Sequence, residues 1–388
     1  MLTILRDLRD FFVSLKLTVA LIAFSIVLIL VATLDQVNLG VWAVQSKYFY
    51  TFLVWWPLGT VSVPVFPGGY TIGGFLLINL LAAHIYRFRF TLRKTGIHLT
   101  HAGLILLIVG QFLTGLVQGE YQMRLDQGQT RNFSESFRNV ELAITDTTDA
   151  KFDDVVAIPE RALARKQTIQ HPKLPFRVTV KTYLPNSTLR MRAGGESETD
   201  TTNAVNDIGS RVIATIQPLT YKEDERNLPS ALVQLDGPEG VIGTWLVSVH
   251  LLDSQWFDYG GHKWKMALRF ARLYQPFSLT LLKFSHDRYA GTDIPKNFSS
   301  RLRINTPDGA GSREVLVYMN SPLRYGGLTF YQSGVENNDR TTVLQVVRNP
   351  SWRIPYIACV VMTLGLLIQF GLHLAGFATK RLSTPAAA

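Results

Sequence analysis

The sequence contains one cysteine, Cys359, which lies inside a long apolar run near the end of the chain. The chain therefore forms no internal disulfide, and it lacks the Cys-x-x-Cys pair that a thiol oxidoreductase needs. Three other signatures are missing: a glycine-rich phosphate loop, a Gly-x-Ser-x-Gly elbow and a His-Glu-x-x-His zinc helix. No standard motif marks this chain as an enzyme on its own.

Charged residues are also scarce, at 18% against 47% hydrophobic residues, which is too apolar for an ordinary soluble domain. Four apolar runs are near the length of about 20 residues that a spanning helix needs. The first lacks a small-residue cleavage site after its apolar core, so we expect a retained anchor and not a removed signal peptide. The four runs are Leu17–Leu34, Thr71–Tyr86, Ile97–Val117 and Ile354–Phe377.

Acidic residues are rare outside the region 120–350. That region holds 28 Lys and Arg against 26 Asp and Glu, whereas the rest of the chain holds 11 against 3. Of the net charge of +10, the segments outside 120–350 therefore carry +8 (11 − 3), so the positive charge lies at the membrane flanks and does not indicate nucleic acid. The positive-inside rule predicts a protein of the cell inner membrane, with both termini cytoplasmic and the large region on the periplasmic or outer side.

This topology predicts an integral membrane protein with four transmembrane helices and a large, mainly-β exported domain inserted between the third and fourth helices. The expected divisions are 1–34 (N-terminal region and first span), 35–70 (aromatic-rich outer loop), 71–90 (second span), 91–118 (cytoplasmic loop and third span), 119–353 (exported domain), 354–378 (fourth span) and 379–388 (cytoplasmic tail). Within the outer loop, we expect residues 48–56 to lie along the membrane surface, because aromatic rings favour the headgroup level.

Alternating and β-branched runs separated by turn residues predict short strands in the exported domain, typical of a sandwich or barrel-like sheet. Residues 192–208 are rich in Gly, Ser, Thr and acidic residues and are typical of a mobile loop. The predicted strands are 139–145, 176–183, 211–216, 230–235, 241–252, 263–274, 277–285, 300–304, 313–319 and 341–347.

Four histidines, His84, His98, His101 and His373, lie in apolar runs near their cytoplasmic ends. Imidazole in a membrane is costly and often functional, and it is a common haem or metal ligand. His98 and His101 are three residues apart and share one helix face, so they cannot both bind one haem from opposite sides. The alternative for each histidine is a structural hydrogen bond to a neighbouring helix.

Arg87 and Arg89 are candidate contacts for haem propionates, although the positive-inside rule alone accounts for basic residues in this loop. The histidines of the exported region are scattered without ligand spacing. The strongest candidate among them is His262, which lies beside the Gly260-Gly261 turn and before Trp264.

Several segments resemble the ResB (CcsB) family of System II cytochrome c biogenesis proteins. The order of three spans, a large exported domain and a final span is also similar to that family. The segments are Ser14–Thr18, Thr100–Gly110 with its Thr-His-Ala-Gly-Leu start, Gln122–Gln129, Tyr318–Leu323, Gly327–Gln332 and Val346–Pro350.

The resemblance implies a non-autonomous subunit of a cytochrome c haem-lyase complex. It implies that the chain works with a ResC/CcsA-type partner to carry transient haem b across the membrane for attachment to apocytochrome c. His101 best matches the family's membrane haem ligand, and a role on the last span would fall on His373. His84 and His98 match less clearly and remain candidate ligands.

The chain departs from fused family members because it lacks the Trp-rich haem-handling segment with its two flanking outer histidines, for which Trp55-Trp56 is no substitute. We therefore expect that it does not complete haem attachment alone. The exported domain is a candidate docking site for apocytochrome c or a thioredoxin-like reductant protein. Two alternatives remain: a haem b membrane electron carrier that reacts with quinone, and a non-haem assembly scaffold.

Overall fold

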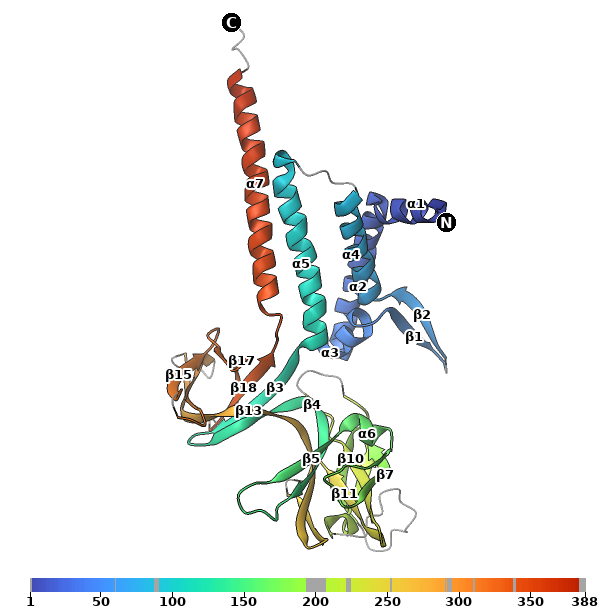
Figure 1. Cartoon of the computed structure of the whole chain (residues 1–388), viewed down its shortest axis with the longest axis vertical. Helices are drawn as coiled ribbons and strands as arrows, with labels where there is room; N and C mark the ends of the chain where they lie inside the picture. Colours follow the sequence, from blue (N-terminus) through green and yellow to red (C-terminus); the bar gives the residue numbers. More distant parts are fainter. Residues whose placement is uncertain are drawn as a thin grey trace. The chain divides into compact units, whose positions relative to one another are not determined.

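The computed structural model (Figure 1) describes residues 2–59, 61–86, 91–192, 207–220, 225–251, 253–289, 291, 295–309, 311–337 and 340–383. The chain forms two compact units. The helical unit consists mainly of residues Met1–Gly119 and Asn349–Ala388, and the β unit of residues Glu120–Thr220 and Asp224–Arg348. The segment expected to be a mobile loop falls largely on residues 193–206, outside the described residues.

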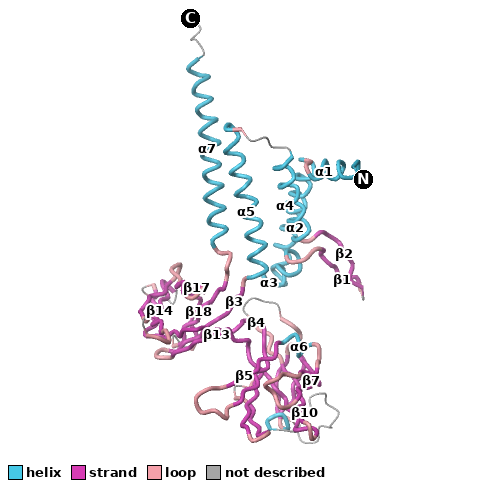
Figure 2. Tube along the Cα trace, viewed as in Figure 1, coloured by secondary structure: helices cyan, strands magenta, loops and turns pink. Residues whose placement is uncertain are grey.

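The helical unit contains four helices that are long and apolar enough to cross a membrane, within the described residues (Figure 2). This agrees with the four spans expected from the sequence. The helices of the unit are α1 (Leu2–Phe12), α2 (Leu15–Leu39), α3 (Val41–Val44), α4 (Gly69–Tyr86), α5 (Thr95–Val117) and α7 (Arg353–Ser383), with the π-helix η1 (Gln45–Phe49) and the 3-10 turn η2 (Leu92–Lys94).

Local signals set both ends of α2. The Ser14 side chain accepts a hydrogen bond from the Lys16 amide at 3.2 Å, which satisfies one of the amides that a helix start leaves without a partner. At the other end Gly40 has φ of 79°, a conformation that glycine adopts without steric cost, and its amide bonds to the Gln36 carbonyl.

Glycines allow α5 and α7 to pack closely. Gly96, Gly103 and Gly110 recur every seven residues and are buried along one face of α5. A Cβ atom at Gly103 would lie 2.4 Å from Cγ of Met362, and one at Gly96 would lie 2.7 Å from the backbone N of Gln369. Small residues at such positions let two helix backbones approach, which is how membrane helices gain van der Waals contact.

A buried asparagine connects the first two spans. Asn79 of α4 is 2% exposed, and its amide donates hydrogen bonds to the carbonyls of Phe12 at 2.7 Å and Ser14 at 3.1 Å. Its side-chain oxygen accepts from the Thr18 hydroxyl at 2.6 Å. These bonds fix α4 against the start of α2 and satisfy a polar group that would be costly to bury alone.

The loop between α2 and α4 contains a buried tyrosine and a β hairpin. Tyr48 is 2% exposed, and its hydroxyl bonds to Asp35 at 2.8 Å, beside the ion pair of Lys47 with Asp35 at 2.7 Å. The strands β1 (Leu53–Leu58) and β2 (Val61–Pro67) then form an antiparallel hairpin. Tyr48 is buried because a polar partner on α2 accepts a hydrogen bond from its hydroxyl, whereas Trp55 and Trp56 are each 49% exposed. The placement of the segment along the membrane surface stays a prediction.

The β unit holds a ten-stranded sheet with the path β15-β14-β13-β4-β3-β18-β17-β16, joined by β12 and β5, and a four-stranded sheet β11-β10-β7-β6, within the described residues. β8 and β9 form a separate pair. The elements are β3 (Gly119–Asp126), β4 (Thr130–Asp146), β5 (Asp154–Pro159), α6 (Glu160–Ala164), β6 (Thr168–Ile169), β7 (Arg177–Leu184), β8 (Ser187–Met191), η3 (Asp207–Ser210), β9 (Val212–Ile216), β10 (Ser230–Gly237), β11 (Gly240–Ser248), β12 (Gln255–Tyr259), β13 (His262–Arg288), β14 (Pro295–Asn305), β15 (Arg313–Tyr318), β16 (Leu323–Tyr325), β17 (Leu328–Glu336) and β18 (Thr341–Arg348).

One long strand contributes to two hydrophobic cores. The early part of β13 packs Trp264 and Met266 into a core with β7 and β10, and its later part packs Leu279 and Leu281 into a core with β3 and β14. The sequence predicted two strands here. The pairing with β4 shifts register between Tyr274 and Leu279, around Pro276, which has no amide hydrogen for the ladder.

Candidate functional site

Three of the four membrane histidines meet between α4 and α5. His84 lies in the last turn of α4, and His98 and His101 lie in the second turn of α5. The His84 ring centroid is 5.1 Å from that of His98 and 5.9 Å from that of His101. Nε2 of His84 and Nδ1 of His98 are 3.4 Å apart, so one of these two rings donates a weak hydrogen bond to the other.

A backbone contact sets the tautomer of His101. Its Nδ1 lies 2.8 Å from the carbonyl oxygen of Ile97, one turn earlier on α5. A carbonyl can only accept, so Nδ1 carries the proton, and Nε2 is the unprotonated nitrogen of the neutral ring. A metal-binding histidine is commonly fixed in this way, by a hydrogen bond from its other ring nitrogen.

The glycine face of α5 explains why this cluster points to α4. His98 and His101 follow Gly96 by two and five positions, which places them about 200° and 140° around the helix from the face that packs on α7. Those directions leave α4 as their neighbour. The expectation that His98 and His101 share a face therefore holds in the fold.

His373 does not belong to this cluster. It lies exposed on α7, four residues beyond Gln369, and shares no ring contact or hydrogen bond with the other three histidines in the described part of the chain. The position of each histidine in its apolar run predicted that all four lie at a similar depth in the membrane. Depth does not fix, however, which face of a helix packs on which neighbouring helix.

The basic residues of the loop between α4 and α5 were the other candidates for the site. Arg87 and Arg89 lie outside the described residues. Arg93 and Lys94 of η2 are exposed. Sequence reasoning missed Gln369 of α7, which packs on Gly96 at the α5–α7 contact, away from the histidines. Its side-chain oxygen is buried with no hydrogen-bond partner among the described residues.

The described residues contain no group of three His, Cys, Asp or Glu side chains arranged to hold a metal ion. A chelating centre of the zinc type needs several convergent ligands at about 2 Å from one point. A single histidine nitrogen is enough, however, to bind one face of a haem iron.

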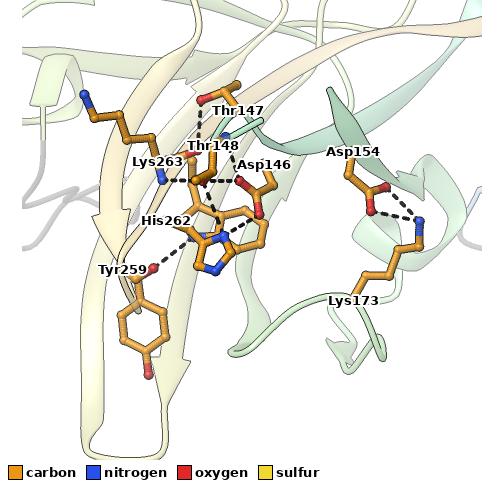
Figure 3. A network of polar contacts seen from close by, with 9 residues as sticks. Asp146, Thr147, Thr148, Asp154, Lys173, Tyr259, His262 and Lys263 are labelled. Carbon is orange, nitrogen blue, oxygen red and sulfur yellow. Dashed lines mark hydrogen bonds and ion pairs between the residues drawn. The ribbon is translucent and has the colours of Figure 1, made fainter. Parts of the chain in front are cut away.

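The β unit carries a second polar cluster around His262 (Figure 3). Nδ1 of His262 lies 2.7 Å from Oδ2 of Asp146, and the Thr148 hydroxyl donates to Oδ1 of the same carboxylate at 2.6 Å. The Thr148 hydroxyl oxygen also lies 3.3 Å from Nδ1 of His262, the same nitrogen that faces Asp146. A nucleophilic triad instead requires the hydroxyl to face the nitrogen opposite the carboxylate. These three residues therefore form a structural network at the junction of β4 and β13.

This network gives the β unit a defined pH dependence. Burial acts to raise the pKa of Asp146, but the Thr148 hydroxyl and amide, together with His262, outweigh it and hold that pKa below its ordinary value. A carboxyl with a depressed pKa stabilises the fold above its unfolded pKa of about 3.9, and this contribution is lost as the pH falls through the folded pKa.

We expect Asp146→Asn to destabilise the β unit near neutral pH, with the difference from wild type narrowing below about pH 4. Guanidinium unfolding of the full-length protein, followed by tryptophan fluorescence, measures this difference. Asp154→Asn is the matched control, because its ion pair with Lys173 at 2.7 Å is 57% exposed on both sides and contributes little (Figure 3). A difference for Asp146→Asn that stays constant down to acid pH would contradict the assignment.

The other described histidines of the β unit have ordinary structural contacts. Nε2 of His250 lies 2.7 Å from the Ser187 carbonyl, and the His286 ring lies 4.4 Å from the Phe298 ring. The Lys173 amide donates to His171 at 3.3 Å. None of these positions brings histidines together.

Four apolar helices with an inserted β unit define the class of the protein as a multi-pass membrane protein. Residues 253–343 match the model of the ResB-like family. Over 92 residues the chain is 32% identical to Protein NrfI of Wolinella succinogenes, which is 24% of this chain but only 10% of that protein's length.

Both matches agree with the family resemblance that the sequence motifs indicate. The family match includes the motifs at Tyr318–Leu323 and Gly327–Gln332. It does not include the histidine cluster at residues 84–101, so the family match gives these histidines no role.

Proposed function

We propose that this chain is a subunit of a System II cytochrome c synthase complex. With a ResC/CcsA-type partner, it delivers haem across the membrane for covalent attachment to apocytochrome c. The observation that carries the proposal is the cluster of His84, His98 and His101, in which Nε2 of His101 is the unprotonated nitrogen.

In this proposal His101 binds one face of the haem iron through Nε2. The haem is cargo and supplies the iron to which the histidine binds. His98 lies on the same face of α5 as His101 and cannot bind the opposite face of the same iron. We propose that the ligand to that face comes from the partner protein. His84 and His98 hold each other through their ring nitrogens, and His84 also packs against His101 and limits its rotation.

The charge pattern supports an orientation in the cytoplasmic membrane with both termini inside and the β unit outside. Haem then enters near the histidine cluster, on the side where it is made, and leaves on the side of the β unit. That unit is suited to hold apocytochrome c or a thioredoxin-like reductant protein near the departing haem.

The test is the haem content and absorption spectrum of the purified protein, with and without its partner. We expect a bis-histidine haem spectrum only in the complex, and we expect His101→Ala to lose it while the complex stays assembled. His373→Ala is the control, because that side chain is exposed on α7 and outside the cluster. Unchanged haem in His101→Ala would mean that another histidine binds the iron. A stable, redox-active haem without the partner would indicate an electron carrier.

A further inference from the structure

The strand β3 presents a polar face that the fold does not need for its core. Met123 and Leu125 are 1% and 0% exposed in the core shared with β13 and β14. Because side chains alternate along a strand, Gln122 and Arg124 lie on the opposite face. In the sequence Gln122 follows the last residue of α5 by five positions.

Two guanidinium groups converge on one neutral oxygen at this face. Nη2 of Arg124 donates to Oε1 of Gln122 at 2.8 Å, and Nη2 of Arg226 donates to the same oxygen at 2.5 Å. Arg226 follows Gln122 by 104 residues and lies on the segment before β10. Two positive charges therefore share an acceptor that carries no negative charge.

The positive charge is only partly balanced. Glu336 pairs with Nε of Arg124 at 3.1 Å, but Arg226 pairs with no carboxylate among the described residues. Burial lowers the pKa of Arg226 to about 10, and the nearby Arg124 adds to that effect. The neighbouring Glu135 is already paired with Arg272 at 3.1 Å.

Arg226 is also held in a fixed place. Its guanidinium lies 4.3 Å from the ring centroid of Phe137 and 4.7 Å from that of Phe270. Rings at these distances attract the cation and limit its movement. Their carbon surfaces also offer an apolar edge beside the charge. The result is a pair of neighbouring cations, of which Arg226 is held against two aromatic rings.

We propose that Arg124 and Arg226 form an oxyanion site that receives a carboxylate of the haem delivered by this chain. Arginine forks bind carboxylates through charge-assisted hydrogen bonds, which are stronger than bonds to a neutral amide oxygen. An incoming carboxylate takes the place of Gln122 as acceptor and relieves the repulsion between the two guanidinium groups. The two aromatic rings suit the apolar edge of a porphyrin next to its propionate groups. The identity of the ligand rests on the proposed function.

The test uses mesoporphyrin IX, which contains no iron and therefore cannot bind to a histidine. Its binding to the full-length protein in phosphatidylcholine nanodiscs is measured by porphyrin fluorescence, beside its uncharged dimethyl ester. We expect the dicarboxylate to bind about tenfold more tightly than the ester. Arg226→Gln and Arg124→Gln should each lose that preference, and Arg226→Lys should keep part of it.

Arg303→Gln is the matched control, because Arg303 of the same sheet forms an exposed ion pair with Glu314 at 2.9 Å. This variant should retain the preference. Equal binding of the dicarboxylate and the ester to wild type, or an unchanged preference in both glutamine variants, overturns the proposal. Because the probe has no iron, failure here is separate from failure of ligation by His101.

Lipid phosphate is the other source of an oxyanion at a membrane surface. Repeating the measurement in nanodiscs that also contain phosphatidylglycerol separates the two sources. If the site takes propionate, wild type keeps its preference for the dicarboxylate in these discs. If the anionic lipid removes the preference, the site binds lipid headgroups and the assignment to haem is wrong.

Discussion

Replacing His101 by alanine is expected to reduce holocytochrome c by about tenfold or more in cells that depend on this protein, while the protein itself accumulates normally in the membrane. The ring of His101 is fixed by the Ile97 carbonyl at 2.8 Å. Under the proposed function, its loss therefore removes an oriented iron ligand and not merely a polar contact. Haem staining of covalently labelled cytochromes measures the effect, and immunodetection measures the level of the protein.

One further variant and a chemical rescue test whether the loss comes from the missing imidazole ring. His373→Ala should leave maturation within a small factor of wild type, because that side chain is exposed and outside the cluster. Imidazole added to the medium should partly restore maturation in His101→Ala, since a small ligand can fill the space that the missing ring leaves. Normal maturation in His101→Ala would favour the scaffold interpretation, in which the membrane histidines are structural.

The spans could be predicted because apolar length depends on composition alone. The run Leu17–Leu34 became α2 (Leu15–Leu39), and Ile97–Val117 became α5 (Thr95–Val117) with the same last residue. Capping by Ser14 and the glycine at Gly40 explain the extra turns of α2. Local signals of this kind are readable in a sequence because they act within a few residues.

The candidate site was predictable only in part. The shared face of His98 and His101 follows from helix geometry, but the approach of His84 depends on which face of α5 packs on α7. That choice comes from Gly96, Gly103 and Gly110, whose partners lie about 250 residues later in the chain. The same limit applies in the β unit, where Arg226 joins Gln122 across a hundred residues of sequence.

The glycine contact between α5 and α7 gives the second large effect that we expect. Gly103→Ala should destabilise the helical unit by about 1–3 kcal/mol, the usual cost of overpacking. The added Cβ would lie 2.4 Å from Cγ of Met362 and 2.9 Å from the carbonyl oxygen of Ala358, so the two helices must separate. A fall in the thermal midpoint of the helical circular dichroism signal in detergent measures this loss.

Gly115→Ala on the same helix is the matched control. Its added Cβ would meet Cε1 of Tyr50 at 3.7 Å, an ordinary contact, and alanine is favoured over glycine in a helix by about 0.5–1 kcal/mol. This variant should therefore be as stable as wild type or slightly more stable.

Adding Met362→Ala to Gly103→Ala should recover only part of the loss, because the carbonyl of Ala358 still blocks the new methyl group. Full recovery would mean that the Met362 side chain alone sets the distance between α5 and α7, and equal midpoints for Gly103→Ala and Gly115→Ala would show that the glycine face does not hold these helices together.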